Sequence, residues 1–375
     1  MSKNKIEKPN RLKKLLDVIS KYILSSDITF KQDDFTIAEK LISNAKKEIE
    51  IFKKGSEYKK LNKILRKSKQ SSVFINAYGI HHRDFDEMSY SIGGHPTATI
   101  LPVLLAFNIG YKKDYLLQAL KLEIILGKLF NPELYNTKYH PTTIIGILGS
   151  TAISARILNL SYKQTINALG ITFSFFSGVK GNFGSDAKSL QVASATENGL
   201  LAALFSQAEF GSNIDLLEQT STLELFVSKK ITNNDIKNLK KLLDKHLSLE
   251  KEFLFKKYDV CGSFHNIMDL ALQDREKCFK DTSNIKEIIL HIHPERLKDK
   301  NILYPRNATQ KKFSPRYLYA YTFLGNNIEQ ITVSDFIAND VVQFIKKIKI
   351  FPDTKIGKWD YKTIHKKTLK LVQKD

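Results

Sequence analysis

The chain has 375 residues and a formal net charge of +20 at pH 7, with 59 Lys and Arg against 39 Asp and Glu. This length favours about two domains. The 42% hydrophobic content is ordinary for a soluble globular protein. No run of about 18 apolar residues predicts a membrane span. Two cysteines, Cys261 and Cys278, predict neither a disulfide framework nor a repeated metal motif.

Lysine pairs spread along the whole sequence account for the positive charge. No dense basic block alternates with aromatic residues, so nucleic acid is not an expected partner. The N-terminal segment lacks the apolar core and cleavage site of a secretory signal. A cytoplasmic location without a membrane partner is therefore the simplest expectation.

Helices are predicted from about residue 11 to residue 65, because apolar residues recur at intervals of three and four positions. Leu15, Val18, Ile19 and Ile23 follow this spacing, and residues 36–52 repeat it. These predicted helices contain no recognisable catalytic or metal-binding motif.

A short span after residue 76 concentrates histidines and acids. Its members are His81, His82, Asp84, Asp86, Glu87 and His95. Such a group suggests a metal site, but the HExxH spacing of two histidines on one helix face is absent. We expect His81 and His82 to be exposed imidazoles, and we assign a functional role to Asp84 and His95.

Two His-Pro steps, at His95 and His140, each precede a helix rich in small residues. Proline favours the first helical turn, so each ring is expected near the positive end of a helix dipole, where an anion can bind. Between the two steps, residues 115–130 predict a buried helix. Its Glu123 must be paired or protonated, which favours a structural role.

Small residues dominate two further predicted helices, at residues 146–155 and 193–203, and predict close helix packing. Between them, a loop with three glycines leads to Lys188. Its glycines could expose backbone N–H groups to an anion, but no nucleotide-binding motif is present.

Beyond about residue 250 the pattern changes. Residues 285–293 alternate as a strand does, and the segment FSPRYLYAYTFLG predicts a helix. We therefore expect a mainly α protein, with a large all-helical domain at residues 1–250 and a smaller α+β domain at residues 251–375.

Five segments resemble the MmgE/PrpD family in the family's order. They are HHRDFDEM with GGHPTATILPVLLAF, KYHPTTIIGILGSTAISARILNLSYKQTINALGIT, FGSDAKSLQVASATENGLLAALFSQAEF, KKYDVCGSFHNIMD, and ATQKKFSPRYLYAYTFLG. The similarity extends from about Asn76 to Gly325. It implies the MmgE/PrpD fold, in which the smaller domain is a lid, in a homodimer without metal or organic cofactor.

The resemblance also implies an active site and a reaction class. The family includes 2-methylcitrate dehydratase, cis-aconitate decarboxylase and iminosuccinate epimerase. The implied catalytic residues are Asp84, His95, His140, Lys188, Lys256 and Tyr317. The implied substrate-binding residues are Met88, Cys261 and His265. The expected substrate is a small di- or tricarboxylate, from which a histidine removes a proton while lysines neutralise the carboxylates.

Several positions depart from the family pattern. The family's Asp-Asp-Thr becomes Asp86-Glu87-Met88, and the segment after Lys188 loses a histidine and an arginine. An acid, Asp259, follows Tyr258 where the family has proline. The chain also ends near the expected end of the lid, so the family's final helical segment would be missing. We expect a divergent hydro-lyase similar to the methylcitrate enzyme. Decarboxylation, epimerisation and a catalytically degenerate binding or assembly protein are the alternatives, and the sequence does not decide which histidine is the base.

Overall fold

The computed structural model describes residues 10–68, 72–107, 112–278, 285–297, 301–332, 334–355 and 369–373. Residues 1–9 and 374–375 lie outside these ranges. Part of the signal-sequence argument depends on residues 1–9. The described residues are mainly helical with two small sheets, which confirms the predicted fold class. None of the described helices combines the length and apolar character that crossing a bilayer requires.

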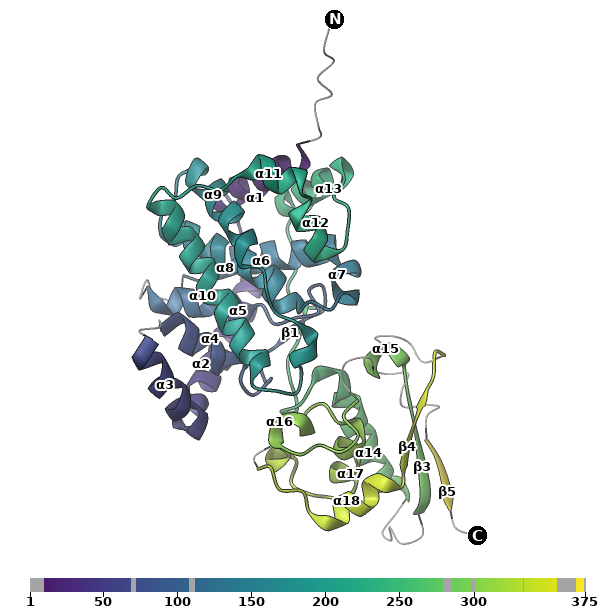
Figure 1. Ribbon diagram of the computed structural model, residues 1–375. Helices are drawn as coiled ribbons and strands as arrows, with labels where there is room; N and C mark the ends of the chain where they lie inside the picture. Colours follow the sequence, from purple (N-terminus) through teal and green to yellow (C-terminus); the bar gives the residue numbers. More distant parts are fainter. Residues whose placement is uncertain are drawn as a thin grey trace, which may run out of the picture. The chain divides into compact units, whose positions relative to one another are not determined.

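The chain separates into two compact units (Figure 1). The first comprises residues 1–180 and 189–255, and the second comprises residues 181–188 and 256–375. The assignment of these units as a catalytic domain and a lid stays a prediction.

The first unit is built from helices and one two-stranded ladder. Its helices are α1 (Arg11–Leu24), α2 (Gln32–Lys54), α3 (Ser56–Ser68), α4 (Ser72–His81), α5 (Thr97–Ala106), α6 (Lys113–Phe130), α7 (Glu133–Asn136), α8 (Pro141–Ile157), α9 (Tyr162–Thr172), α10 (Ala187–Gln207, of which the first two residues belong to the second unit), α11 (Ile214–Gln219), α12 (Thr222–Val227) and α13 (Asn233–Asp244). Strand β1 (Met88–Ser89) pairs antiparallel with β2 (Phe253–Leu254).

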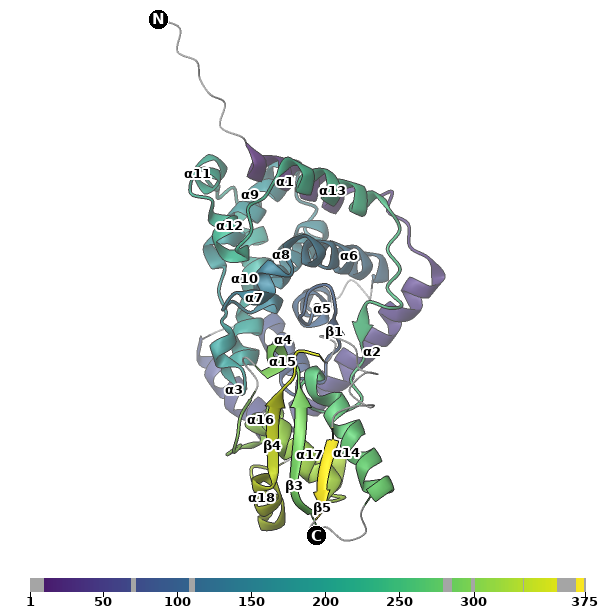
Figure 2. The ribbon, with the colours of Figure 1, turned by 90° about the vertical axis from the view of Figure 1, so that its right-hand side faces the viewer.

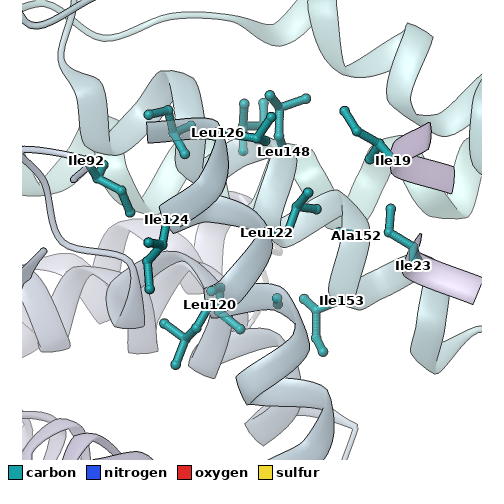
Figure 3. Packing of buried hydrophobic residues seen from close by; sticks show 14 of the residues in the cluster. Ile19, Ile23, Ile92, Leu120, Leu122, Ile124, Leu126, Leu148, Ala152 and Ile153 are labelled. Carbon is teal, nitrogen blue, oxygen red and sulfur yellow. The ribbon is translucent and has the colours of Figure 1, made fainter. Parts of the chain in front are cut away.

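Helix α5 lies at the centre of the first unit, among α2, α4, α6 and α8 (Figure 2). The apolar spacing seen in the sequence produces a continuous core between α1, α6 and α8 (Figure 3). Leu122 and Leu126 of α6 and Leu148 and Ile153 of α8 are nearly inaccessible to solvent there. Because most side chains of α5, α6 and α8 are buried, polar groups on these helices need partners inside the protein.

The second unit contains a three-stranded sheet with helices. Strand β3 (Ile285–Ile292) lies between β4 (Ile348–Pro352), which is parallel to it, and β5 (Leu369–Gln373), which is antiparallel (Figure 1). The helices are α14 (His265–Cys278), α15 (Pro294–Leu297), α16 (Ala308–Lys311), α17 (Pro315–Phe323) and α18 (Asn339–Lys346). Ile288, Leu290 and Ile292 are buried at alternate positions, so the predicted strand is confirmed.

The small residues of α8 allow a close approach to α6. A Cβ atom on Gly149 would lie 1.8 Å from Oε1 of Glu123. That carboxyl group is buried and accepts a hydrogen bond from the Thr99 hydroxyl, with a distance of 3.0 Å. Glu123 therefore occupies the space that a larger residue at position 149 would need.

Replacing Gly149 with alanine should lower the free energy of unfolding by about 1–3 kcal/mol or more, as overpacking of a tight core does. Urea unfolding followed by circular dichroism measures this loss. Gly211→Ala is the matched control, because a Cβ atom there meets nothing within 4 Å. Equal stability of the two variants would contradict the packing argument.

Candidate active site

The loop that follows α4 brings Asp84 toward His95. Asp84 has a left-handed backbone conformation, with φ of 57°, which aspartate tolerates better than most residues. Its N–H donates to the carbonyl oxygen of His81 at 3.1 Å. In this turn, Oδ1 of Asp84 lies 3.6 Å from Nε2 of His95.

Asp86 lies between two histidines. Its Oδ2 accepts a hydrogen bond from Nδ1 of His81 at 2.7 Å, and its Oδ1 lies 3.3 Å from Nδ1 of His95. The ring centroids of the two histidines are 4.7 Å apart. Burial alone would raise the pKa of Asp86, but the positive charges of His81 and then His95 outweigh it. The pKa of this carboxyl group is therefore held well below its ordinary value.

The prediction that His81 is exposed is wrong. Its side chain is 1% exposed, because α4 packs against α2 and α5 and ends inside the unit. His82, the next residue, is half-buried, and its ring stacks on Tyr78 with centroids 5.3 Å apart. The difference in burial between His81 and His82 comes from tertiary packing alone. The local sequence therefore did not predict the burial of His81, apart from the presence of a nearby acid.

The two His-Pro steps meet. The N–H of His95 donates to Oγ1 of Thr142, on the first turn of α8, at 3.2 Å. The ring of His140, at the N-cap of α8, lies 6.2 Å from that of His81, measured between centroids. Helices α5 and α8 thus begin side by side, and their N-termini add a positive potential at the histidine cluster.

Two further acids are buried within this unit. Burial, and then the negative charge of Asp86, raise the pKa of Glu87 to about 8. Glu87 therefore carries a proton at neutral pH. Burial also raises the pKa of Glu123 well above its ordinary value. The predicted state of Glu123, either paired or protonated, is confirmed by this shift and by its bond to Thr99.

The ladder between β1 and β2 anchors the loop before His95. The hydroxyl of Ser89 donates to Oε1 of Glu252 at 2.5 Å, and the N–H of Ser91 donates to the same oxygen at 3.0 Å. Met88, a predicted substrate-binding residue, faces Leu254 across the ladder. The local sequence showed no strand signal here, because two residues are too few for an alternating pattern.

Lys188, Lys256 and Tyr317 belong to the second unit. Nζ of Lys188 lies 5.7 Å from the ring centroid of Phe183, and Nζ of Lys256 donates to the carbonyl oxygen of Val260 at 3.2 Å. The Tyr317 side chain is 1% exposed. Burial raises its pKa, and its hydroxyl donates to a backbone carbonyl oxygen at 3.2 Å.

The remaining predicted residues lie at the start of α14. Cys261 is a buried free thiol, and the buried ring of His265 packs edge-on against Tyr258, with centroids 5.4 Å apart. Asp259 is engaged within the same unit. Its carboxylate lies 3.5 Å from Nζ of Lys312 and accepts a hydrogen bond from Thr332 at 3.0 Å.

Among the predicted residues, the structure therefore gathers Asp84, His95 and His140 in the first unit, and adds His81 and Asp86. Lys188, Lys256, Cys261, His265 and Tyr317 are placed in the second unit. The contacts of the first group form a chain of alternating acids and imidazoles. Such a chain can hold and pass a proton, because Asp86 lies between the rings of His81 and His95 and Asp84 lies beside His95.

The same cluster has the geometry to hold a cation. His81, Asp84, Asp86 and His95 each offer one ligand atom within 4.8 Å of the others, and all four side chains are buried. Imidazole and carboxylate suit zinc or iron. However, the 2.7 Å contact of His81 with Asp86 is a direct hydrogen bond that a metal would have to break. The expectation of a metal-free site stays a prediction.

The chain is similar to proteins of a known family. The sequence model of the MmgE/PrpD N-terminal domain matches residues 49–234. Cis-aconitate decarboxylase of Mus musculus is 24% identical over 303 residues, which cover 74% of this chain and 60% of that protein. Cis-aconitate decarboxylase of Homo sapiens is 27% identical over 240 residues, which cover 59% of this chain and 48% of that protein.

The chain thus spans about half to three fifths of the length of these curated relatives. The matched domain contains α4, α5 and α8, with Asp84, His95 and His140. The match also includes the loops that bring these residues together. By this domain match and its relatives, the chain belongs to the MmgE/PrpD family.

Proposed function

We propose that this protein is a lyase that moves a proton beside a carboxylate group of a small di- or tricarboxylate, without a metal or organic cofactor. The observation that carries the proposal is the buried chain of Asp84, His95, Asp86 and His81, with His140 nearby, at the N-termini of α5 and α8. Membership of the family supports a lyase, and the positive helix ends favour an anionic substrate.

In this proposal, His95 and Asp84 handle the carbon-bound proton. Both ring nitrogens of His95 face carboxylate oxygens, so the ring can hold a proton with its charge balanced. Lys188 and Lys256 would neutralise the substrate carboxylates, while Met88, Cys261 and His265 would contact the rest of the substrate. Tyr317 has the weakest support as a proton donor, since its hydroxyl already donates to a backbone carbonyl.

Decarboxylation is the reaction that the relatives favour, because both are named cis-aconitate decarboxylases. The bond between the carboxylate and its carbon would break, carbon dioxide would leave, and the electron pair on carbon would take a proton from the site. Dehydration of a 2-methylcitrate-like acid is the alternative. There the base takes the carbon-bound proton and an acid protonates the departing hydroxyl. Epimerisation needs only removal and return of the proton.

We also propose that the protein acts as a homodimer in the cytoplasm.

The test is proton exchange. The full chain is incubated with cis-aconitate, citrate or 2-methylcitrate in deuterated buffer, and NMR follows deuterium at the carbon beside the carboxylate, together with carbon dioxide release. We expect exchange with at least one acid. His95→Ala should slow it by roughly 10²–10⁴-fold, which is the usual contribution of a general acid or base.

His291→Ala is the matched control. Nδ1 of His291 also pairs with an aspartate, Asp353, at 3.1 Å, but both side chains are partly exposed and lie in the second unit. This variant should exchange at the wild-type rate, and EDTA should leave the rate unchanged. No exchange with any acid would overturn the proposal in favour of a binding protein. A rate lost with EDTA and restored by zinc would make the cluster a metal site.

A further inference from the structure

A short backbone ladder holds the loop after α9 against the start of α8. The N–H of His140 donates to the carbonyl oxygen of Gly178 at 3.1 Å, and the N–H of Lys180 donates to that of Lys138 at 2.8 Å. Gly178 has φ of 95°, and a Cβ atom there would come within 2.4 Å of Oγ1 of Thr143. Glycine thus lets the loop lie directly beside His140, and the position of Val179 is fixed by its neighbours.

The side chain of Gln191, on α10, pairs with the backbone of Val179. The N–H of Val179 donates to Oε1 of Gln191 at 3.0 Å, and Nε2 of Gln191 donates to the Val179 carbonyl oxygen at 3.2 Å. A backbone N–H can only donate and a carbonyl oxygen can only accept. These two bonds therefore fix which end of the amide is oxygen and which is nitrogen.

The same Nε2 group lies 2.8 Å from Nδ1 of His140. Because the amide nitrogen carries only hydrogens to donate, Nδ1 of His140 must be the acceptor. A neutral imidazole that accepts at Nδ1 carries its single proton at Nε2. The amide cannot turn to suit the other tautomer without losing both bonds to Val179.

We propose that Gln191 is a positioning residue that holds His140 as the neutral tautomer with its proton at Nε2. Within the proposed function, on which this assignment of roles depends, His140 then gives a hydrogen bond to a substrate oxygen as negative charge develops there. It is not the base, because its one lone pair is already occupied by the Gln191 amide.

The two histidines at the helix entrances thus have opposite surroundings. A protonated His140 ring would turn an N–H at Nδ1 toward the N–H of Gln191, which disfavours that form. His95 instead has Oδ1 of Asp86 at 3.3 Å from its Nδ1 and Oδ1 of Asp84 at 3.6 Å from its Nε2, so each ring nitrogen lies near a carboxylate oxygen rather than an N–H group. The proton-accepting role therefore falls to the His95 group. Environments that differ in this way separate donor from base in other enzymes.

The decisive measurement needs no substrate. Long-range ¹H–¹⁵N NMR of the full chain labelled at histidine distinguishes the tautomers, and the signals of His140 are assigned by their loss in His140→Asn. We expect an unprotonated Nδ1 and a protonated Nε2 in the wild type. In Gln191→Glu, the carboxylate accepts from Nδ1–H while keeping the bond from the Val179 N–H. The proton should therefore move to Nδ1, and the ring should become charged at a higher pH than in the wild type.

Gln207→Glu is the matched control, because Gln207 is an exposed residue near the end of the same helix. It should leave the His140 signals unchanged, and Gln191→Leu should give a mixture of tautomers. A protonated Nδ1 in the wild type, or unchanged signals in Gln191→Glu, would overturn the inference even if the enzyme proves active.

Where the exchange assay detects activity, Gln191→Glu should lower kcat by roughly 10²–10³-fold at a pH at which the ring is neutral, because the neutral ring then carries its proton at Nδ1 and one preorganised donor at Nε2 is lost. It should also shift the pH profile, which a merely structural role would not do. If none of the acids exchanges its carbon-bound proton for deuterium, the proposed function fails. The NMR measurement still determines the tautomer of His140 in that case.

Discussion

Replacing Asp86 with alanine should lower the free energy of unfolding by roughly 3–5 kcal/mol, as does removal of one partner from a buried ion pair. The Asp86 side chain is 1% exposed and interacts with two buried imidazoles, at 2.7 Å from His81 and 3.3 Å from His95. Without this carboxylate, Nδ1 of His81 loses its buried hydrogen-bond partner, and both rings lose a nearby negative charge. Urea unfolding at pH 7, followed by circular dichroism, measures the loss.

Asparagine at the same position separates charge from hydrogen bonding. Asp86→Asn keeps an acceptor for Nδ1 of His81 but removes the negative charge, so its loss of stability should be smaller than that of Asp86→Ala. The control is Asp353→Ala, which breaks a similar but partly exposed bond to His291 at 3.1 Å and should leave the unfolding midpoint nearly unchanged. If Asp86→Ala is no less stable than Asp353→Ala, the buried pair does not stabilise the fold.

The helices of the candidate site were predictable because their signals are local. Proline at the first turns, small residues and apolar spacing predicted the starts of α5 and α8, and these begin at Thr97 and Pro141. The carboxyl of Glu123 could also be predicted to be paired or protonated, because a lone acid in a leucine-rich helix has no other low-energy state.

His81, Asp86 and Gln191 could not be assigned in the same way. The burial of His81 depends on how α4 packs against α5, and the sequence around it is equally compatible with an exposed ring. Gln191 lies in the segment after Lys188 that departs from the family pattern, and that departure alone predicts no contact with His140. Its bonds to Val179 and His140 depend on a loop that turns back on α8, for which a left-handed glycine is the only local indication.

The stability of the folded chain should depend on pH through Glu87. The pKa of Glu87 is about 8 in the folded chain, against an ordinary value of 4.5. Between these values, the folded state keeps a proton that the unfolded state has lost. The stability contributed by this proton is fully present below pH 4.5 and is lost as pH rises through about 8, at roughly 1.4 kcal/mol per pH unit. Asp86 acts in a different range, because its lowered pKa makes it lose stability only in acid, below its ordinary value of 3.8.

Glu87→Gln should remove this loss, since a neutral amide replaces the protonated acid at every pH. The free energy of unfolding of the variant, relative to that of the wild type, should rise between pH 5 and pH 9 by up to several kcal/mol. Glu57→Gln is the control. Burial would raise the pKa of Glu57, but hydrogen bonds, first from its own backbone, and nearby positive charges outweigh this effect and lower it. Its substitution should therefore produce no gain over that range. Parallel pH curves for wild type and Glu87→Gln would mean that Glu87 is ionised in the folded protein. The cluster of buried acids and histidines around Asp86 would then carry an extra negative charge. That charge would favour a bound cation over a proton at this site.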